Sequence, residues 1–101
     1  MKIIYVAGPY RAETENGVFE NIIHARRVAQ RLWHEGFAVI CPHLNSAYMG
    51  DKQNDTVFLK GDIEILARCD AIYMLTGWMY SEGATVELEL AESLDLEVVY
   101  E

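Results

Sequence analysis

The chain has 101 residues, of which 51% are hydrophobic, and a formal net charge of −8 from 16 acidic and 8 basic residues. This length predicts a single domain over residues 1–101, and the hydrophobic content excludes a disordered chain. The negative charge disfavours a nucleic-acid polymer as partner, because phosphate backbones repel it. No apolar run is long enough for a membrane span, and the two cysteines form no disulfide or metal-ligand pattern, so we expect a cytoplasmic protein that binds neither a membrane nor a metal.

Hydrophobic patterning predicts an alternation of strands and helices. Short apolar runs bounded by turn residues are typical of buried strands, and longer segments with one apolar face are typical of helices. The predicted elements are, in chain order, a strand over residues 2–7, a loop over 10–17, a helix over 18–35, a strand over 37–41, a polar loop over 43–56, a helix over 57–69, a strand over 70–75, a turn over 76–83, a helix over 84–94 and a strand over 96–100.

This order predicts an α/β fold, a small doubly wound (flavodoxin-like) parallel sheet of about four strands with helices on both faces. Such sheets bind ligands beyond the carboxyl ends of the strands, where the strand order reverses. With the order 2-1-3-4 this point lies between the first and third strands, so the loops at residues 8–10 and 77–83 would form the site, beside Pro42 and His43. Because four strands make a small sheet, we expect a homodimer or larger homo-oligomer.

Two carboxylates break the helical patterning. Successive helical residues lie about 100° apart, which places Glu87 and Asp62 inside the apolar arcs of the last two predicted helices. The arcs comprise Ala84, Val86, Leu88, Leu90, Ala91 and Leu94 around Glu87, and Phe58, Leu59, Ile65, Leu66 and Cys69 around Asp62. Burying an unpaired carboxylate costs several kcal/mol. Either acid alone has a structural explanation, at a helix N-terminus or on backbone donors, but the pair favours a functional site.

Paired carboxylates at one cleft match the chemistry of glycosidic bonds, in which one attacks the anomeric carbon and the other assists the leaving group. Tyr5, near the end of the first strand, could hydrogen-bond in this site or be a core aromatic residue. Ser81 and Gly83 begin a helix that could bind an anion, or Ser81 is an ordinary N-cap. The remaining candidates follow strand ends or turns: Arg11 and His43, which could meet a phosphate or lie on the surface, and Trp78 and Tyr80, which could stack on a base or line a subunit contact.

Three segments carry a resemblance to a known family. They are YVAGPYR at residues 5–11, Asp62 with CDA at residues 69–71, and SEGATVELELA at residues 81–91. They resemble the nucleoside 2-deoxyribosyltransferase superfamily, which includes the 2'-deoxynucleoside 5'-phosphate N-hydrolases. The resemblance follows the element order over nearly the whole chain.

The resemblance implies a covalent mechanism without metal or cofactor. Glu87 would be the nucleophile that forms a (deoxy)ribosyl-enzyme, Asp62 would hold or protonate the departing base, and Tyr5 would orient Glu87. The serine at position 81 and the arginine at position 11, shortly after Gly8, resemble the pattern of the nucleotide-hydrolase branch of the superfamily. The residues that we expect to bind substrate are Gly8, Pro9, Tyr10, Arg11, His43, Ser81 and Gly83. Pro9 departs from the hydrolases, because proline has no N–H to offer a phosphate.

We therefore expect an enzyme, a hydrolase or transferase that cleaves the N-glycosidic bond of a (deoxy)nucleoside 5'-monophosphate. One alternative is a catalytically silent nucleotide-binding or assembly module on the same fold. Another is a glycohydrolase of a larger nucleotide such as NAD. Release of free base, ligand binding without turnover, and release of nicotinamide would distinguish the three.

Overall fold

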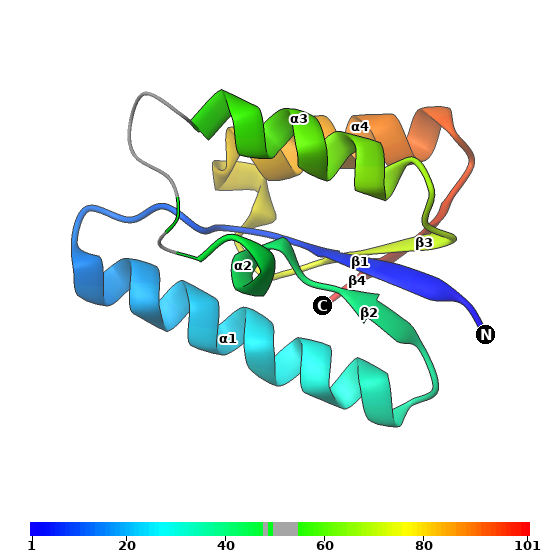
Figure 1. Ribbon diagram of the computed structural model, residues 1–101, viewed down its shortest axis with the longest axis horizontal. Coiled ribbons are helices and arrows are strands. Elements are labelled where there is room, and N and C mark those ends of the chain that lie inside the picture. Colours follow the sequence, from blue (N-terminus) through cyan, green and yellow to red (C-terminus); the bar gives the residue numbers. More distant parts are fainter. Residues whose placement is uncertain (48, 50–54) are drawn as a thin grey trace.

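Four parallel strands form one sheet, in the order β2-β1-β3-β4, in the computed structural model of the chain, which describes residues 1–47, 49 and 55–101 (Figure 1). The strands are β1 (Ile3–Ala7), β2 (Ala38–Ile40), β3 (Ala71–Met74) and β4 (Glu97–Tyr100). In register, Tyr5 of β1 lies between Ile40 of β2 and Ile72 of β3. The predicted α/β class and strand order are confirmed, and the strand order reverses between β1 and β3.

Helices cover both faces of this sheet, as predicted (Figure 1). One long helix lies on one face, and two helices of equal length lie side by side on the other. The helical elements of the described residues are α1 (Glu15–His34), α2 (Pro42–Asn45), α3 (Asp55–Leu66), the 3-10 turn η1 (Trp78–Tyr80) and α4 (Glu82–Ser93). No helix in this part of the chain is both long and apolar enough to span a membrane.

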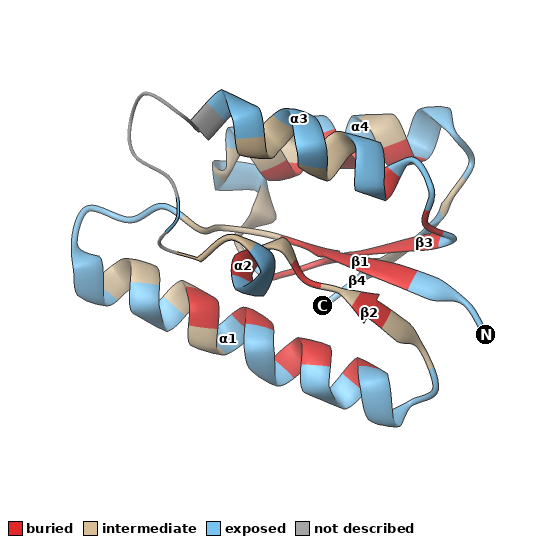
Figure 2. Cartoon of the chain, viewed as in Figure 1, coloured by how far each residue is buried: buried red, intermediate tan, exposed pale blue. Residues whose placement is uncertain are grey.

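The sheet separates two hydrophobic clusters, and Figure 2 shows buried residues concentrated in the strands and on the helix faces toward them. Because side chains alternate along a strand, Ile4 and Val6 of β1 pack with α1, whereas Tyr5 and Ala7 pack with α3 and α4. This alternation places the phenol of Tyr5 on the same side of the sheet as the two helices that carry the candidate carboxylates.

Helix boundaries differ from the sequence prediction by one to three residues, as in α3, which covers Asp55–Leu66 where residues 57–69 were predicted. Helix α1 begins three residues earlier than predicted, because the side chain of Thr14 accepts a hydrogen bond from Gly17 N (3.0 Å) and so caps it. The short helix α2 occupies the start of the predicted loop, with Pro42 at its first position. Proline is favoured there because the N–H that it lacks would have no partner within the helix.

The apolar arcs predicted for α3 and α4 are wrong in part. Ile65, Val86 and Leu94 were expected to be buried, yet they are 37%, 41% and 44% exposed. The stripe of α4 that contacts the sheet is narrower than its apolar arc and contains residues at helical spacing: Ala84, Glu87, Leu88 and Ala91. Leu94 lies beyond the last helical residue. Glu87 is therefore on the buried stripe itself.

We predict that Gly8→Ala lowers the free energy of unfolding. Gly8 follows β1, and a Cβ atom there would lie 2.5 Å from Cβ and 2.8 Å from Cδ1 of Leu75, a core residue. The overpacking should cost about 1–3 kcal/mol in urea denaturation. Gly61 is the matched control, because it lies within α3 and no atom of the described residues lies within 4 Å of its ideal Cβ. Gly61→Ala should stabilise the fold by about 0.5–1 kcal/mol, and a Gly8→Ala variant of equal stability would contradict the close approach.

Candidate active site

A cavity of about 800 Å³ opens beyond the carboxyl end of β1. Its wall is built by the end of β1 with the following loop, by α2, by α3 and by the N-terminal half of α4. The structure brings nine of the candidate residues to this wall: Gly8, Pro9, Tyr10, Arg11, His43, Asp62, Ser81, Gly83 and Glu87. The tenth, Tyr5, does not line the cavity and reaches Glu87 through its hydroxyl group.

Glu87 is a buried carboxyl group with one fixed partner. It is 7% exposed, and the hydroxyl of the fully buried Tyr5 donates a hydrogen bond to its Oε2. Burial raises the pKa of Glu87 to about 7, while the bond from Tyr5 lowers it and the negative charge of Asp62 raises it further. Burial, with the charge of Glu87, also raises the pKa of Tyr5 above its ordinary value. The phenol therefore stays protonated and donates to whichever form of Glu87 is present.

Asp62 is the second acid of the cavity. It lies on α3, is partly buried, and has a pKa raised to about 6 by burial. Two acids whose pKa values lie near neutrality can divide a single proton between them, because one ionised carboxylate opposes ionisation of the other. Such a pair offers one nucleophile or base and one acid at the same pH, and shifts of this kind are concentrated at functional sites.

The N-terminus of α4 supplies hydrogen-bond donors at the same cavity. The Ser81 hydroxyl caps the helix by accepting from Ala84 N (3.2 Å) and retains its own O–H as a donor. The N–H groups of Glu82 and Gly83 fall in the first turn, where a helix provides no internal partners. Arg11 is the one cationic residue among the described residues that line the cavity. These groups together can bind an anion.

His43 holds the loop after β1. It is 5% exposed, and its Nε2 donates to the carbonyl oxygen of Pro9 (2.8 Å). Burial lowers the pKa of His43, so the ring is neutral with its one N–H engaged by Pro9. Within the described residues its buried Nδ1 has no partner, and its ring meets Tyr10 edge-on at 5.8 Å. A phosphate contact for His43 stays a prediction. Pro9, which has no N–H to offer a phosphate, instead accepts the hydrogen bond from His43 with its carbonyl oxygen.

The two aromatic candidates, Tyr80 and Trp78, lie in different surroundings. Tyr80 lines the cavity and is 90% exposed, so stacking on a base and contact with a subunit both stay open for it. Trp78 is not among the lining residues. Its ring packs against Tyr100 at 6.0 Å and against the core cluster below α4.

Several lining residues were missed by the sequence reasoning. Phe58 and Leu59 lie one helical turn before Asp62. Helical spacing placed them in the apolar arc around Asp62, but they were expected to pack in the core and not to line the site. Pro42 and Ser46 reach the cavity through α2, and Glu82 through the first turn of α4. Pro42 and Glu82 lie where the sequence placed the site, beside His43 and within the loop over residues 77–83. No local pattern indicated Ser46, because its place depends on contacts between distant segments. Among the described residues, no group of three or more His, Cys, Asp or Glu side chains could hold a metal ion.

Comparisons with known proteins agree with this architecture. A family model described as "Domain of unknown function (DUF4406)" matches residues 2–100. Among solved structures, the chain is similar to a 2-deoxyribosyltransferase from the psychrotolerant bacterium Bacillus psychrosaccharolyticus, with a TM-score of 0.67 and 24% identity over 97% of this chain and 70% of that one. No curated protein matches. At this identity the likeness shows the fold, so the predicted resemblance to the nucleoside 2-deoxyribosyltransferase superfamily is confirmed at the level of fold.

Proposed function

The chain belongs to the family described as "Domain of unknown function (DUF4406)", and we propose that it is an enzyme that cleaves the N-glycosidic bond of a (deoxy)nucleoside 5'-monophosphate. The observation that carries this proposal is the buried Glu87, which accepts a hydrogen bond from Tyr5 and lines one cavity with Asp62. The similar solved structure, a 2-deoxyribosyltransferase, supports nucleoside glycosyl chemistry for this fold.

The proposed reaction has two steps at the anomeric carbon. Ionised Glu87 forms a bond to this carbon while the bond to the base nitrogen breaks, and protonated Asp62 gives its proton to the leaving base. Water then attacks the same carbon, releases the carboxylate of Glu87 and passes one proton to Asp62, which restores the starting state. A second base in place of water would give transfer instead of hydrolysis.

The spacing along α4 supports a 5'-monophosphate as substrate. Gly83, at the donor-rich N-terminus, and Glu87 are four residues apart on one helix. With a rise of about 1.5 Å per residue, their backbones are about 6 Å apart along the axis. This distance is comparable with the separation between phosphorus and the anomeric carbon of a nucleoside 5'-monophosphate. The cavity volume of about 800 Å³ lies within the range typical of small-molecule sites.

A base-release assay tests the proposal. The protein is incubated with deoxynucleoside 5'-monophosphates, with the matching deoxynucleosides and with NAD, each with and without a second free base, and the products are separated by chromatography. We expect free base from at least one monophosphate, faster than from its nucleoside. Binding of monophosphates without base release would support the silent binding module instead, and release of nicotinamide alone would support the glycohydrolase of a larger nucleotide.

The proposed mechanism predicts a bell-shaped pH dependence of kcat/KM. The active form has Glu87 ionised and Asp62 protonated. It is the less populated of the two arrangements with one proton on the pair, because Glu87 has the higher pKa, and its share of the singly protonated state does not change with pH. Below both pKa values the pair holds two protons, and above both it holds none. With values of about 7 for Glu87 and about 6 for Asp62, activity should peak near pH 6.5 and fall on both sides. Rates measured from pH 4 to 9 with one monophosphate check this, and a flat profile would contradict the shared proton.

A further inference from the structure

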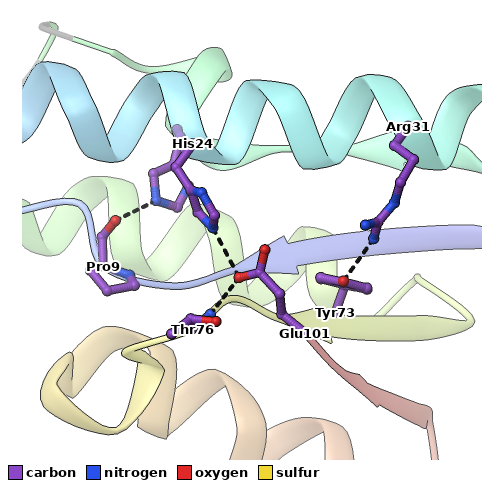
Figure 3. Close-up of polar contacts among 7 residues, drawn as sticks. Pro9, His24, Arg31, Tyr73, Thr76 and Glu101 are labelled. Carbon is purple, nitrogen blue, oxygen red and sulfur yellow. Dashed lines mark hydrogen bonds and ion pairs between the residues drawn. The ribbon is translucent and has the colours of Figure 1, made fainter.

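The turn between β3 and α4 is tied to two segments that are distant in the sequence. Oε1 of Glu101, which follows β4, accepts from Thr76 N (2.7 Å) and lies 2.9 Å from Nε2 of His24 on α1 (Figure 3). The backbone N of Glu101 also donates to Met74 O at the end of β3 (2.9 Å). One carboxylate therefore joins the start of the turn to α1.

A ring contact from the preceding residue adds to this tie. Tyr100 packs its ring on Trp78 of η1 at 6.0 Å. Within the described residues, the backbone bonds of the turn are local: Trp78 N to Leu75 O, Tyr80 N to Gly77 O, and Ser81 N to Trp78 O. Such bonds fix the shape of the turn but not its position on the sheet. Tyr100 and Glu101, together with the packing of Trp78 on the core cluster, provide contacts that fix the position.

The charge of Glu101 makes the tie stronger than a neutral hydrogen bond. Partial burial raises the pKa of Glu101, but the hydrogen bonds from Thr76 and His24 outweigh this effect, so the pKa lies below its ordinary value. The group is therefore a carboxylate at neutral pH. Hydrogen bonds to an ionised acceptor are shorter and stronger than neutral ones.

We propose that Glu101, supported by Tyr100, is a positioning residue that holds the β3–α4 turn so that the donors of Ser81 and Gly83 meet the substrate phosphate. This inference rests on the proposed function for the identity of the ligand. The turn ends at Ser81, the N-cap of α4, so a displaced turn misplaces the phosphate donors. Glu87 lies more than a turn further along α4 and is held separately by Tyr5, so the glycosidic step should be affected little.

The test compares Glu101→Ala with wild type on a monophosphate and on its nucleoside. Loss of the two bonds should raise KM for the monophosphate about five- to tenfold, with kcat within about twofold and KM for the nucleoside unchanged. Glu101→Gln, whose amide oxygen can still accept from Thr76 N–H, should restore most of the affinity. Glu97→Ala is the matched control, because Glu97 lies on β4 and forms an exposed pair with Lys2 (3.0 Å); its KM should equal that of wild type.

Hydrogen exchange gives a readout that does not depend on catalysis. In Glu101→Ala, amide exchange over residues 76–82 should accelerate about tenfold while exchange in β1 stays unchanged. If wild type releases no base, the proposed function is overturned. The role of Glu101 would still be decided by amide hydrogen exchange and by the affinity for the monophosphate measured by calorimetry. Unchanged exchange at residues 76–82, or equal losses for nucleoside and monophosphate, would overturn the positioning role. If Glu101→Ala does not fold, His24→Ala serves in its place, because it removes one of the two side-chain contacts of Glu101. It should raise KM for the monophosphate by a smaller factor, and an unchanged KM would overturn the positioning role.

Discussion

Glu87→Gln is expected to lower kcat for base release by about ten-thousandfold, with KM for the monophosphate near its wild-type value. The amide has the shape of the carboxyl group and can still accept from the Tyr5 hydroxyl, so the fold should be kept. It cannot form a stable bond to the anomeric carbon. The donors that we propose for the phosphate lie at the start of α4 and are not altered, which is why binding should survive.

The matched variant is Asp62→Asn, measured with the same substrate by the same chromatography. It removes the proposed proton donor but leaves the proposed nucleophile, so we expect a smaller loss, about 10²- to 10⁴-fold, and the loss of one limb of the pH profile. If Glu87→Gln keeps a tenth of the wild-type kcat, Glu87 does not take part in the chemical step.

The double variant Tyr5→Phe/Glu87→Leu is expected to be more stable than wild type at pH 8, by about 1–3 kcal/mol. Each single change leaves a buried group without its partner, since Tyr5 is 0% exposed and Glu87 is 7% exposed. Such an orphaned group costs about 1–3 kcal/mol. Replacing both removes the buried acid and the buried hydroxyl together. Urea denaturation of all four proteins measures the effect.

The pH dependence of this stability difference has a definite sign. The folded pKa of Glu87, about 7, lies above the ordinary glutamate value of 4.5, so between these pH values the folded state retains a proton that the unfolded state has lost. Wild type therefore loses stability as pH rises from about 4.5 through 7, by about 3 kcal/mol at most. The advantage of the double variant should shrink on acidification to pH 4.5. A double variant less stable than both single variants would contradict a poorly compensated acid.

The architecture followed from the sequence because its signals are local. Four short apolar runs, each bounded by glycine, proline or polar residues, predicted strands within a few residues of β1 to β4, and the right-handed crossover rule left few orders for them. The start of α1, which depends on the side-chain cap of Thr14, was missed, and so was the short helix α2, which begins at Pro42 without a side-chain cap. Burial was wrong at Val86 and Ile65, because hydrophobicity alone does not state which strip of a helix the sheet contacts.

The site was predictable where an acid contradicted its apolar surroundings. Glu87 and Asp62 stood out for this reason, and the structure places both on the cavity wall. The contact of His43 with Pro9 and the tie of Glu101 to Thr76 and His24 join segments far apart in the sequence, and no spacing rule indicates them. The roles of the site residues, the homo-oligomer and the cytoplasmic location stay predictions.

A covalent adduct on Glu87 is the most direct test of the account. The protein is mixed with a deoxynucleoside 5'-monophosphate, quenched in acid within a single turnover, and analysed by intact mass and peptide mapping. We predict a phosphorylated deoxyribosyl group on a peptide that contains Glu87, absent in Glu87→Gln. Base release at the wild-type rate with no adduct at any time, or with an adduct on another residue, would contradict the proposal that Glu87 is the nucleophile.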